Sequence, residues 1–233
     1  MSKIGIIIPS VRKPANLRVA HKRPSNLRLM GGHAYGHYGR RGDPGPDPGD
    51  WSELDVKDQE EALKVLASLV EEDSGDPQIR QAAIRIVDSC DARDDVCELS
   101  EIFNAVKSGS KKVSWLRDGL KYMSDPRAKD WFPSPSRLMK MCQDGACAED
   151  CDGHAVLVAA LAASLGFRVG LRAYAKPGRP KGNYEHIYAV AMLPKVDDGS
   201  KPEVFALDTS ADAGVSYAGW EPPRGQVLTA WME

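Results

Sequence analysis

Three residues whose side chains suit nucleophilic catalysis follow one another in the second half of the chain: Cys151, His186 and Asp208. A cysteine attacks a carbonyl carbon as the thiolate, so its thiol needs a base that accepts the proton. Histidine can accept it near neutral pH, and a carboxylate bonded to the imidazole fixes the tautomer and stabilises the charged ring. These residue types predict an acyl-transfer site with Cys151 as nucleophile, His186 as base and Asp208 as orienting acid.

The segment that begins at Cys151 predicts a buried helix. Asp150 suits the N-cap position, residues 155–163 are almost entirely Ala, Val and Leu, and Gly166 is typical of a residue that ends a helix. The first turn of a helix presents unpaired N–H groups and a partial positive charge, and both favour a thiolate over a thiol. The predicted helix therefore places Cys151 where its backbone supports nucleophilic chemistry.

Three β-like runs follow, at residues 168–174, 186–193 and 204–208. His186 begins the second run and Asp208 ends the third. Adjacent strands would bring the two side chains together, against the N-terminus of the buried helix. A chain that starts with helices and ends with one buried helix and an antiparallel sheet belongs to the α+β class.

Helical patterns precede the predicted site. They run from residue 52 or 55 to 72, onward from Asp76-Pro77, and over 94–107, whereas residues 113–123 fit either a strand or a short helix. We therefore expect one domain over residues 51–233. Its helical part covers about 51–142, and the helix and sheet that carry the site cover about 147–223.

The first fifty residues differ from the rest in composition. Residues 1–42 hold nine Lys or Arg and no acid, which leaves −11 for the remainder, given a formal charge of −2 for the whole chain. We expect an extended basic arm over residues 1–50, ending in a Pro/Gly linker. One six-residue pattern occurs twice in it, as Lys13-Pro14-Ala15-Asn16-Leu17-Arg18 and Arg23-Pro24-Ser25-Asn26-Leu27-Arg28.

The arm allows three interpretations. The two copies could be docking peptides for an acidic protein surface, or a coincidence within a biased segment. Nine positive charges could also bind nucleic acid in a salt-sensitive way. Only Tyr35 and Tyr38 offer stacking for bases, so docking to protein ranks above nucleic acid.

The composition of the whole chain limits the classes of protein to which it can belong. The chain is 42% hydrophobic and 27% charged, as expected of a globular protein, and no apolar run reaches the roughly 18 residues of a membrane span. The apolar run at residues 4–8 is too short for a signal-peptide core. Five cysteines, an odd number, do not suggest a disulfide framework, so we expect a reducing cytoplasm. We also expect no cofactor.

The residues around the predicted site resemble the transglutaminase-like superfamily of papain-like cysteine proteins, and most closely its tailed-phage and prophage branch. The family's nucleophile motif, its histidine strand and its aspartate strand are matched in order, and the resemblance covers about residues 79–223. The matching segments are Glu149-Asp150-Cys151-Asp152-Gly153-His154-Ala155, Glu185-His186-Ile187-Tyr188, Leu207-Asp208-Thr209, Tyr122-Met123-Ser124-Asp125-Pro126, Ser134-Pro135-Ser136 and Gly219-Trp220-Glu221-Pro222.

The resemblance implies a papain-like core and cysteine-dependent acyl transfer on an amide bond, with hydrolysis of a peptide or isopeptide bond as the first expectation. The fold also allows a cross-linking transglutaminase, or a non-enzymatic virion adaptor that docks on capsid or tail proteins through residues 1–42. A protein or peptide would be the substrate. The implied location is the host cytoplasm, with association with the virion as an alternative.

Two features depart from the family pattern. Glu149 replaces the usual Gly, and Gly153 and His154 stand where the family often has an acidic residue. The carboxylates of Glu149, Asp150 and Asp152 surround Cys151 and oppose formation of a thiolate.

The other cysteines leave one further alternative. Cys142, Cys147, Cys151 and His154 form C-x4-C-x3-C-x2-H, a possible zinc set, although the short C-x2-C spacing is absent and we expect no metal. A free Cys142 or Cys147 could instead form a redox pair with Cys151. Gln143 is the candidate side-chain donor to an oxyanion.

Overall fold

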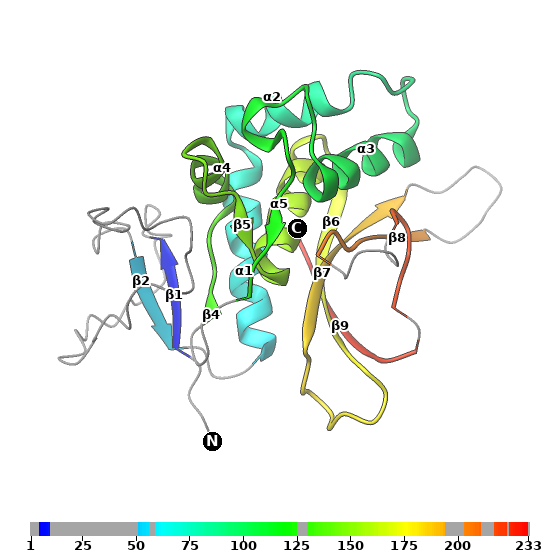
Figure 1. Cartoon of the computed structure of the whole chain (residues 1–233). Helices are drawn as coiled ribbons and strands as arrows, with labels where there is room; N and C mark the ends of the chain where they lie inside the picture. Colours follow the sequence, from blue (N-terminus) through cyan, green and yellow to red (C-terminus); the bar gives the residue numbers. More distant parts are fainter. Residues whose placement is uncertain are drawn as a thin grey trace.

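The chain folds into helices packed on one face of an antiparallel sheet, as the α+β prediction requires (Figure 1). The computed structural model describes residues 5–9, 51–55, 59–124, 130–193, 203–210, 217–222 and 224–232. The helices in these ranges are α1 (Gln59–Ser74), α2 (Pro77–Ile86), α3 (Asp95–Ser108), the 3-10 turn η2 (Ser114–Leu116), α4 (Pro135–Gln143) and α5 (Cys151–Ser164). The strands are β1 (Gly5–Pro9), β2 (Trp51–Asp55), β3 (Lys121–Tyr122), β4 (Asp130–Trp131), β5 (Ala148–Glu149), β6 (Arg168–Ala175), β7 (His186–Leu193), β8 (Glu203–Leu207) and β9 (Gln226–Trp231).

Short polar side chains start the helices. Asp76 accepts hydrogen bonds from the amides of Gln78 and Ile79, ahead of Pro77 at the first position of α2. Asp94 caps α3 in the same way, and the oxygen of Ser134 caps α4. The N-terminus of α4 has a second acceptor in the buried Asp73 of α1, whose carboxylate lies 2.7 Å from the Ser136 amide. The ends of helices distant in sequence are thus tied together.

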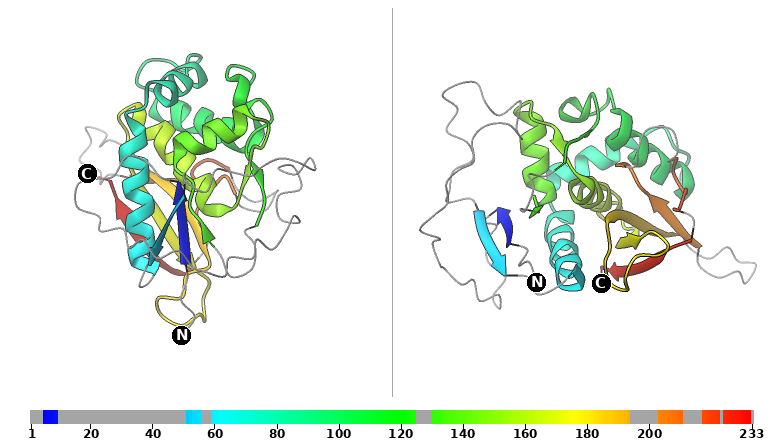
Figure 2. Two further views of the ribbon diagram at one scale, coloured as in Figure 1. Left: turned by 90° about the vertical axis from the view of Figure 1, so that its left-hand side faces the viewer. Right: turned by 60° about the horizontal axis from the view of Figure 1, so that its bottom comes forward.

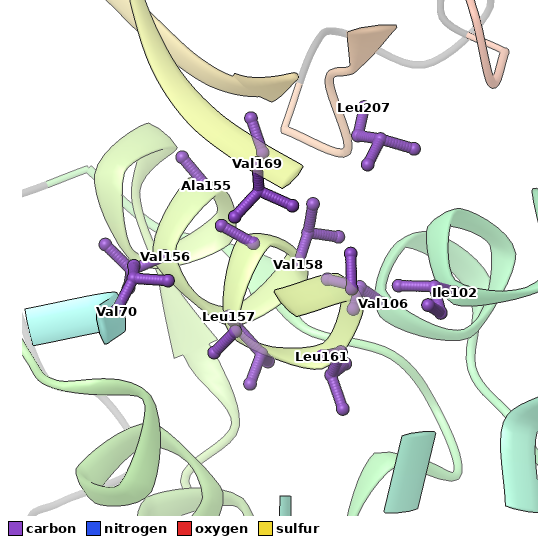
Figure 3. Packing of buried hydrophobic residues seen from close by; sticks show 14 of the residues in the cluster. Val70, Ile102, Val106, Ala155, Val156, Leu157, Val158, Leu161, Val169 and Leu207 are labelled. Atoms are coloured by element: carbon purple, nitrogen blue, oxygen red, sulfur yellow. The ribbon is translucent and has the colours of Figure 1, made fainter. Parts of the chain in front are cut away.

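Helix α5 is the centre of the core. Its residues from Asp152 to Ala162 are all buried, because helices α1, α2, α3 and α4 surround it on one side and strands β6 and β7 on the other. Figure 3 shows Leu157, Leu161 and their neighbours packed among side chains from both halves of the chain. A helix that is apolar on every face has this environment. None of the helices in the described ranges is both long and apolar enough to cross a bilayer.

The main sheet has the strand order β8-β7-β6-β9, and every neighbouring pair is antiparallel. Ala189 and Leu207 are paired in register and both contact the α5 core, whereas Tyr188 and Val190 point to the other face of the sheet. Figure 2 shows the helices covering the first of these faces. This register brings the start of β7 and the end of β8 together beside the N-terminus of α5.

A smaller sheet lies on the other side of α1 and α4 (Figure 1). Strand β1 pairs antiparallel with β2 and parallel with β4. One segment of the predicted N-terminal arm is therefore a strand, which its five-residue apolar run allows. Residues 10–50, with the repeated basic pattern and the linker, lie outside the described residues.

Several boundaries differ from the sequence prediction. The first helix begins at Gln59 and not at residue 52 or 55, because residues 51–55 form β2 instead. Polar and apolar residues do not alternate regularly from Trp51 to Asp55, so this strand is held by its pairing with β1 and not by a local pattern. The ambiguous region 113–123 divides into η2 and β3. Helix α4 and strand β9 were not predicted.

Replacing Gly153 with Ala tests how tightly the start of α5 is packed. A Cβ at Gly153 would lie 2.5 Å from the Cβ of Glu149, so Glu149 has to move. We expect overpacking to exceed the helix-propensity gain of about 1 kcal/mol and to lower the free energy of unfolding by about 1–2 kcal/mol, measured by urea denaturation. Gly75→Ala is the matched control, because nothing lies within 4 Å of its added Cβ. Equal stability of the two variants would contradict the close packing.

Candidate active site at the N-terminus of helix α5

The Cys151 thiol lies against the backbone at the start of β7. Asp150 caps α5, and its carboxylate accepts a hydrogen bond from the Asp152 amide at 3.1 Å. The Cys151 sulfur accepts hydrogen bonds from the Ile187 amide and from its own amide. Burial, followed by the charge of Asp150, raises the pKa of this thiol to about 12, although both N–H groups oppose the rise. At neutral pH the resting group is therefore a thiol that needs a base.

The imidazole of His186 is hydrogen-bonded to the carboxylate of Asp208. Nε2 of His186 lies 2.8 Å from Oδ2 of Asp208, and the hydroxyl of Ser210 donates to Oδ1 of the same carboxylate at 3.2 Å. Asp208 is only 1% exposed, whereas the His186 side chain is 22% exposed. A buried carboxylate on Nε2 leaves Nδ1 as the ring nitrogen that can accept a proton.

The structure thus brings the three predicted residues to one place but links them unequally. His186 and Asp208 share a direct hydrogen bond, whereas Cys151 contacts the peptide group that follows His186. No hydrogen bond joins the Cys151 sulfur to the His186 ring, and none engages Nδ1 of His186, within the part of the chain that the structure describes. The hydrogen bond between nucleophile and base is often longer or less well aligned in a resting enzyme than in its substrate complex.

Three carboxyl groups crowd the thiol. Oxygens of Glu149, Asp150 and Asp152 lie within 4.8 Å of one another, close enough to offer ligands to a hard cation. Burial raises the pKa of Asp152 well above its usual range, and a side-chain hydrogen bond with Asp150 adds to this rise. The raised pKa of Asp152 favours its neutral form, which reduces the negative charge that opposes thiolate formation.

His154 belongs to the site, although the sequence analysis noted it only as a departure from the family pattern and as a possible metal ligand. It follows Cys151 by three positions, so both side chains lie on one face of α5. Its Nδ1 lies 3.1 Å from Oγ1 of Thr209, the residue after Asp208. Burial lowers the pKa of His154 to about 4, so the ring is neutral at pH 7. His154 therefore connects the nucleophile helix to the segment that carries Asp208.

The disulfides correct the predictions made for the other cysteines. All five cysteines lie in described residues; Cys90 is bonded to Cys97, Cys142 is bonded to Cys147, and Cys151 is free. The expectation of no disulfide framework is therefore wrong, because an odd count is equally satisfied by two pairs and one free thiol. The inference of a reducing compartment loses its basis. Cys142 and Cys147 are each other's partners, so the four-residue zinc set and a redox pair with Cys151 are both excluded.

A thiol count tests this pairing. The protein purified without reductant and unfolded in denaturant should present one reactive thiol per chain, and the Cys151→Ser variant none. Reduction before unfolding should raise both counts by four. Ellman's reagent measures the count, and peptide mapping identifies the labelled cysteine. Three or more reactive thiols in the unreduced protein would contradict at least one of the two pairs.

Gln143 and the described cavity both lie apart from this constellation. Gln143 is exposed at the end of α4 and makes no hydrogen bond with Cys151, His186 or Asp208, so the proposed oxyanion donor gains no support. A cavity of about 330 Å³ lies at the opposite, C-terminal end of α5. It is lined by Val70, Glu71, Ser74, Ala163, Gly166, Phe167, Arg168, Val169 and Met232.

Comparison of the chain with protein-family models, curated proteins and solved structures finds no match.

Proposed function

We propose that this protein is a cysteine acyl-transfer enzyme that cleaves an amide bond, with Cys151 as nucleophile, His186 as base and Asp208 as orienting acid. The observation that carries the proposal is the hydrogen bond between His186 and the buried Asp208. The amide of the next residue, Ile187, donates to the Cys151 sulfur, so the nucleophile lies beside this pair. The match to the nucleophile, histidine and aspartate motifs of transglutaminase-like proteins supports the same roles and a papain-like core.

The reaction follows from the atoms at hand. The Cys151 sulfur attacks the amide carbonyl carbon while its proton passes to Nδ1 of His186. The carbon–nitrogen bond then breaks, and the imidazolium returns the proton to the departing amine, which leaves a thioester on Cys151. Water, deprotonated by His186, then attacks the thioester. The carbon–sulfur bond breaks, the imidazolium returns its proton to the Cys151 sulfur, and a carboxylic acid is released. Asp208 remains ionised and stabilises the imidazolium in both halves of the reaction.

The high pKa of the thiol fits this sequence of events. A thiol with a pKa of about 12 does not persist as a thiolate beside His186 at neutral pH, so proton transfer has to accompany attack. The amides of Cys151 and Ile187 then stabilise the charge that develops on sulfur.

An acylation experiment tests the proposal. We expect p-nitrophenyl acetate to release a burst of nitrophenol and to place one acetyl group on Cys151, detected by intact mass and removed by hydroxylamine as a thioester is. The Cys151→Ala variant should show neither. The burst in the wild-type protein should be followed by slow turnover, and an added primary amine separates transfer to an amine from hydrolysis. Equal labelling of native and urea-unfolded protein would mean an ordinary thiol and would overturn the proposal.

A further inference from the structure

The ring of His186 is stacked on a buried tyrosine of its own strand. His186 and Tyr188 are two positions apart on β7, so both side chains leave the same face of the sheet. Their ring centroids are 5.9 Å apart and their planes are inclined by 25°. Tyr188 is 2% exposed, which fixes it as a support for the partly exposed imidazole. Burial raises the pKa of its hydroxyl to about 12, so this support is uncharged at neutral pH.

Arg172 of β6 holds the far end of Tyr188. The two residues are directly paired in the register of β6 and β7, and the guanidinium donates to the tyrosine hydroxyl. The same side chain donates from Nε to Oγ1 of Thr229, its partner on β9, at 3.0 Å. Its Nη1 forms an ion pair with Glu221, and the Arg172 side chain is only 13% exposed. A charge this buried requires its neutralising partner.

The segment that supplies Glu221 crosses the face of the sheet that the helices leave uncovered. The amide of Gly219 donates to the carbonyl of Ala206 at 2.8 Å, which anchors the segment on β8. Gly219 has φ of +88°, and a Cβ there would lie 3.0 Å from the Phe205 ring, so glycine suits this position on both counts. Two residues later, Glu221 reaches Arg172 on β6. The Gly-Trp-x-Pro motif in the sequence therefore has a structural role.

We propose that Glu221, Arg172 and Tyr188 are positioning residues that together fix the imidazole of His186 against Asp208. This inference rests on the proposed function, in which His186 is the base. Glu221 forms an ion pair with Arg172, Arg172 donates to the hydroxyl of Tyr188, and the Tyr188 ring stacks on the imidazole. The C-terminal segment would in this way control the orientation of a residue more than thirty positions earlier in the sequence.

The expected size of each effect follows from the order of the contacts. Tyr188 stacks on the His186 ring itself, so its loss should release the imidazole most. Arg172 and Glu221 act through Tyr188, so their replacement should release the imidazole less. A general loss of stability would not reproduce this order.

NMR of the histidine ring provides the test. We expect Glu221→Gln and Arg172→Met to weaken the downfield Nε2 proton signal of the His186 hydrogen bond to Asp208, because each removes one side of the ion pair behind Tyr188. Tyr188→Leu should weaken or abolish the downfield Nε2 proton signal of the bond to Asp208. Tyr188→Leu risks misfolding, whereas Glu221 is 43% exposed in its side chain and its replacement should leave a folded protein.

The control removes one carboxylate of an unrelated ion pair. Asp88→Asn breaks the contact between Asp88 and Lys112 and should leave the Nε2 proton signal of His186 unchanged. An Nε2 proton signal that stays as in the wild-type protein in Glu221→Gln, in Arg172→Met and in a folded Tyr188→Leu variant would overturn the inference. This readout needs no substrate, so a failure of Cys151 acylation would contradict the proposed function without altering the outcome here.

Discussion

We expect replacement of His186 by Gln to lower the rate at which Cys151 is acylated or alkylated at pH 7 by about 10²–10⁴-fold, the usual contribution of a general base. The reason lies in the thiol itself. With a pKa of about 12 and no base, its thiolate fraction would be about 10³-fold below that of an ordinary cysteine with a pKa near 8.5. Any neutral-pH reactivity above that level requires proton transfer to a neighbour, and His186 is bonded to a carboxylate suited to support it.

The measurement is the iodoacetamide rate of Cys151 as a function of pH in wild-type protein and in His186→Gln. Each protein serves as its own control when unfolded in denaturant, because Cys151 then reacts as an ordinary thiol and the two rates should coincide. Cys151 is the one free cysteine, so the measured alkylation rate belongs to this residue alone. A folded His186→Gln variant that reacts as fast as the wild-type protein would remove His186 from the mechanism.

The second large effect is acid sensitivity caused by His154. Its pKa falls from 6.5 in an unfolded chain to about 4 in the folded protein. Above pH 6.5 the ring is neutral in both states and contributes no pH dependence. Between pH 6.5 and 4 the unfolded chain binds a proton that the folded protein does not, so stability is lost as the pH falls. The shift corresponds to about 3 kcal/mol over this window.

Urea denaturation at several pH values between 7 and 4 isolates this contribution when it is compared with the His154→Asn variant. The variant should lose about 3 kcal/mol less than the wild-type protein over the same range. The comparison is needed because Asp152 acts in the opposite direction: its raised pKa means that acidification relieves an unfavourable charge. Thr209→Ser keeps His154 and a hydroxyl, and should retain the wild-type pH dependence. Parallel curves for wild type and His154→Asn would show that the buried ring does not titrate as described.

Much of the fold was readable in the sequence because local signals and packing agree. Asp76, Asp94 and Asp150 each cap the predicted helix, and the all-apolar interior of α5 gave its buried position correctly. The strand at residues 186–193 was predicted with its bounds. Strand β9 was not predicted, because Gln226–Trp231 carries no strong alternation and is held by pairing with β6. Such pairing connects residues more than fifty positions apart, and no local pattern reports it.

The site was predictable only as far as residue type and order allow. Sequence order placed Cys151 at a helix start and His186 and Asp208 on neighbouring strands. It could not show that His154 bonds to Thr209, or that Tyr188 stacks on His186, because both contacts depend on which face of an element meets which neighbour. The prediction that the chain has no disulfide framework failed for a similar reason, since a count of five cysteines does not determine which of them are paired.

The central position of α5 has a consequence for how this chain reaches its native state. Helices α1 to α4 precede α5 in the sequence, strands β6 to β9 follow it, and both groups bury their apolar surface on the same fourteen-residue helix. Neither group of elements forms a complete hydrophobic core without the other, so neither should fold by itself. Helix α5 cannot be fully buried until the last strands have been synthesised. Assembly therefore depends on contacts between distant parts of the sequence, which slows folding and leaves an exposed apolar helix in any truncated product. A shortened chain that lacks the C-terminal sheet should aggregate, although most of its helices remain encoded.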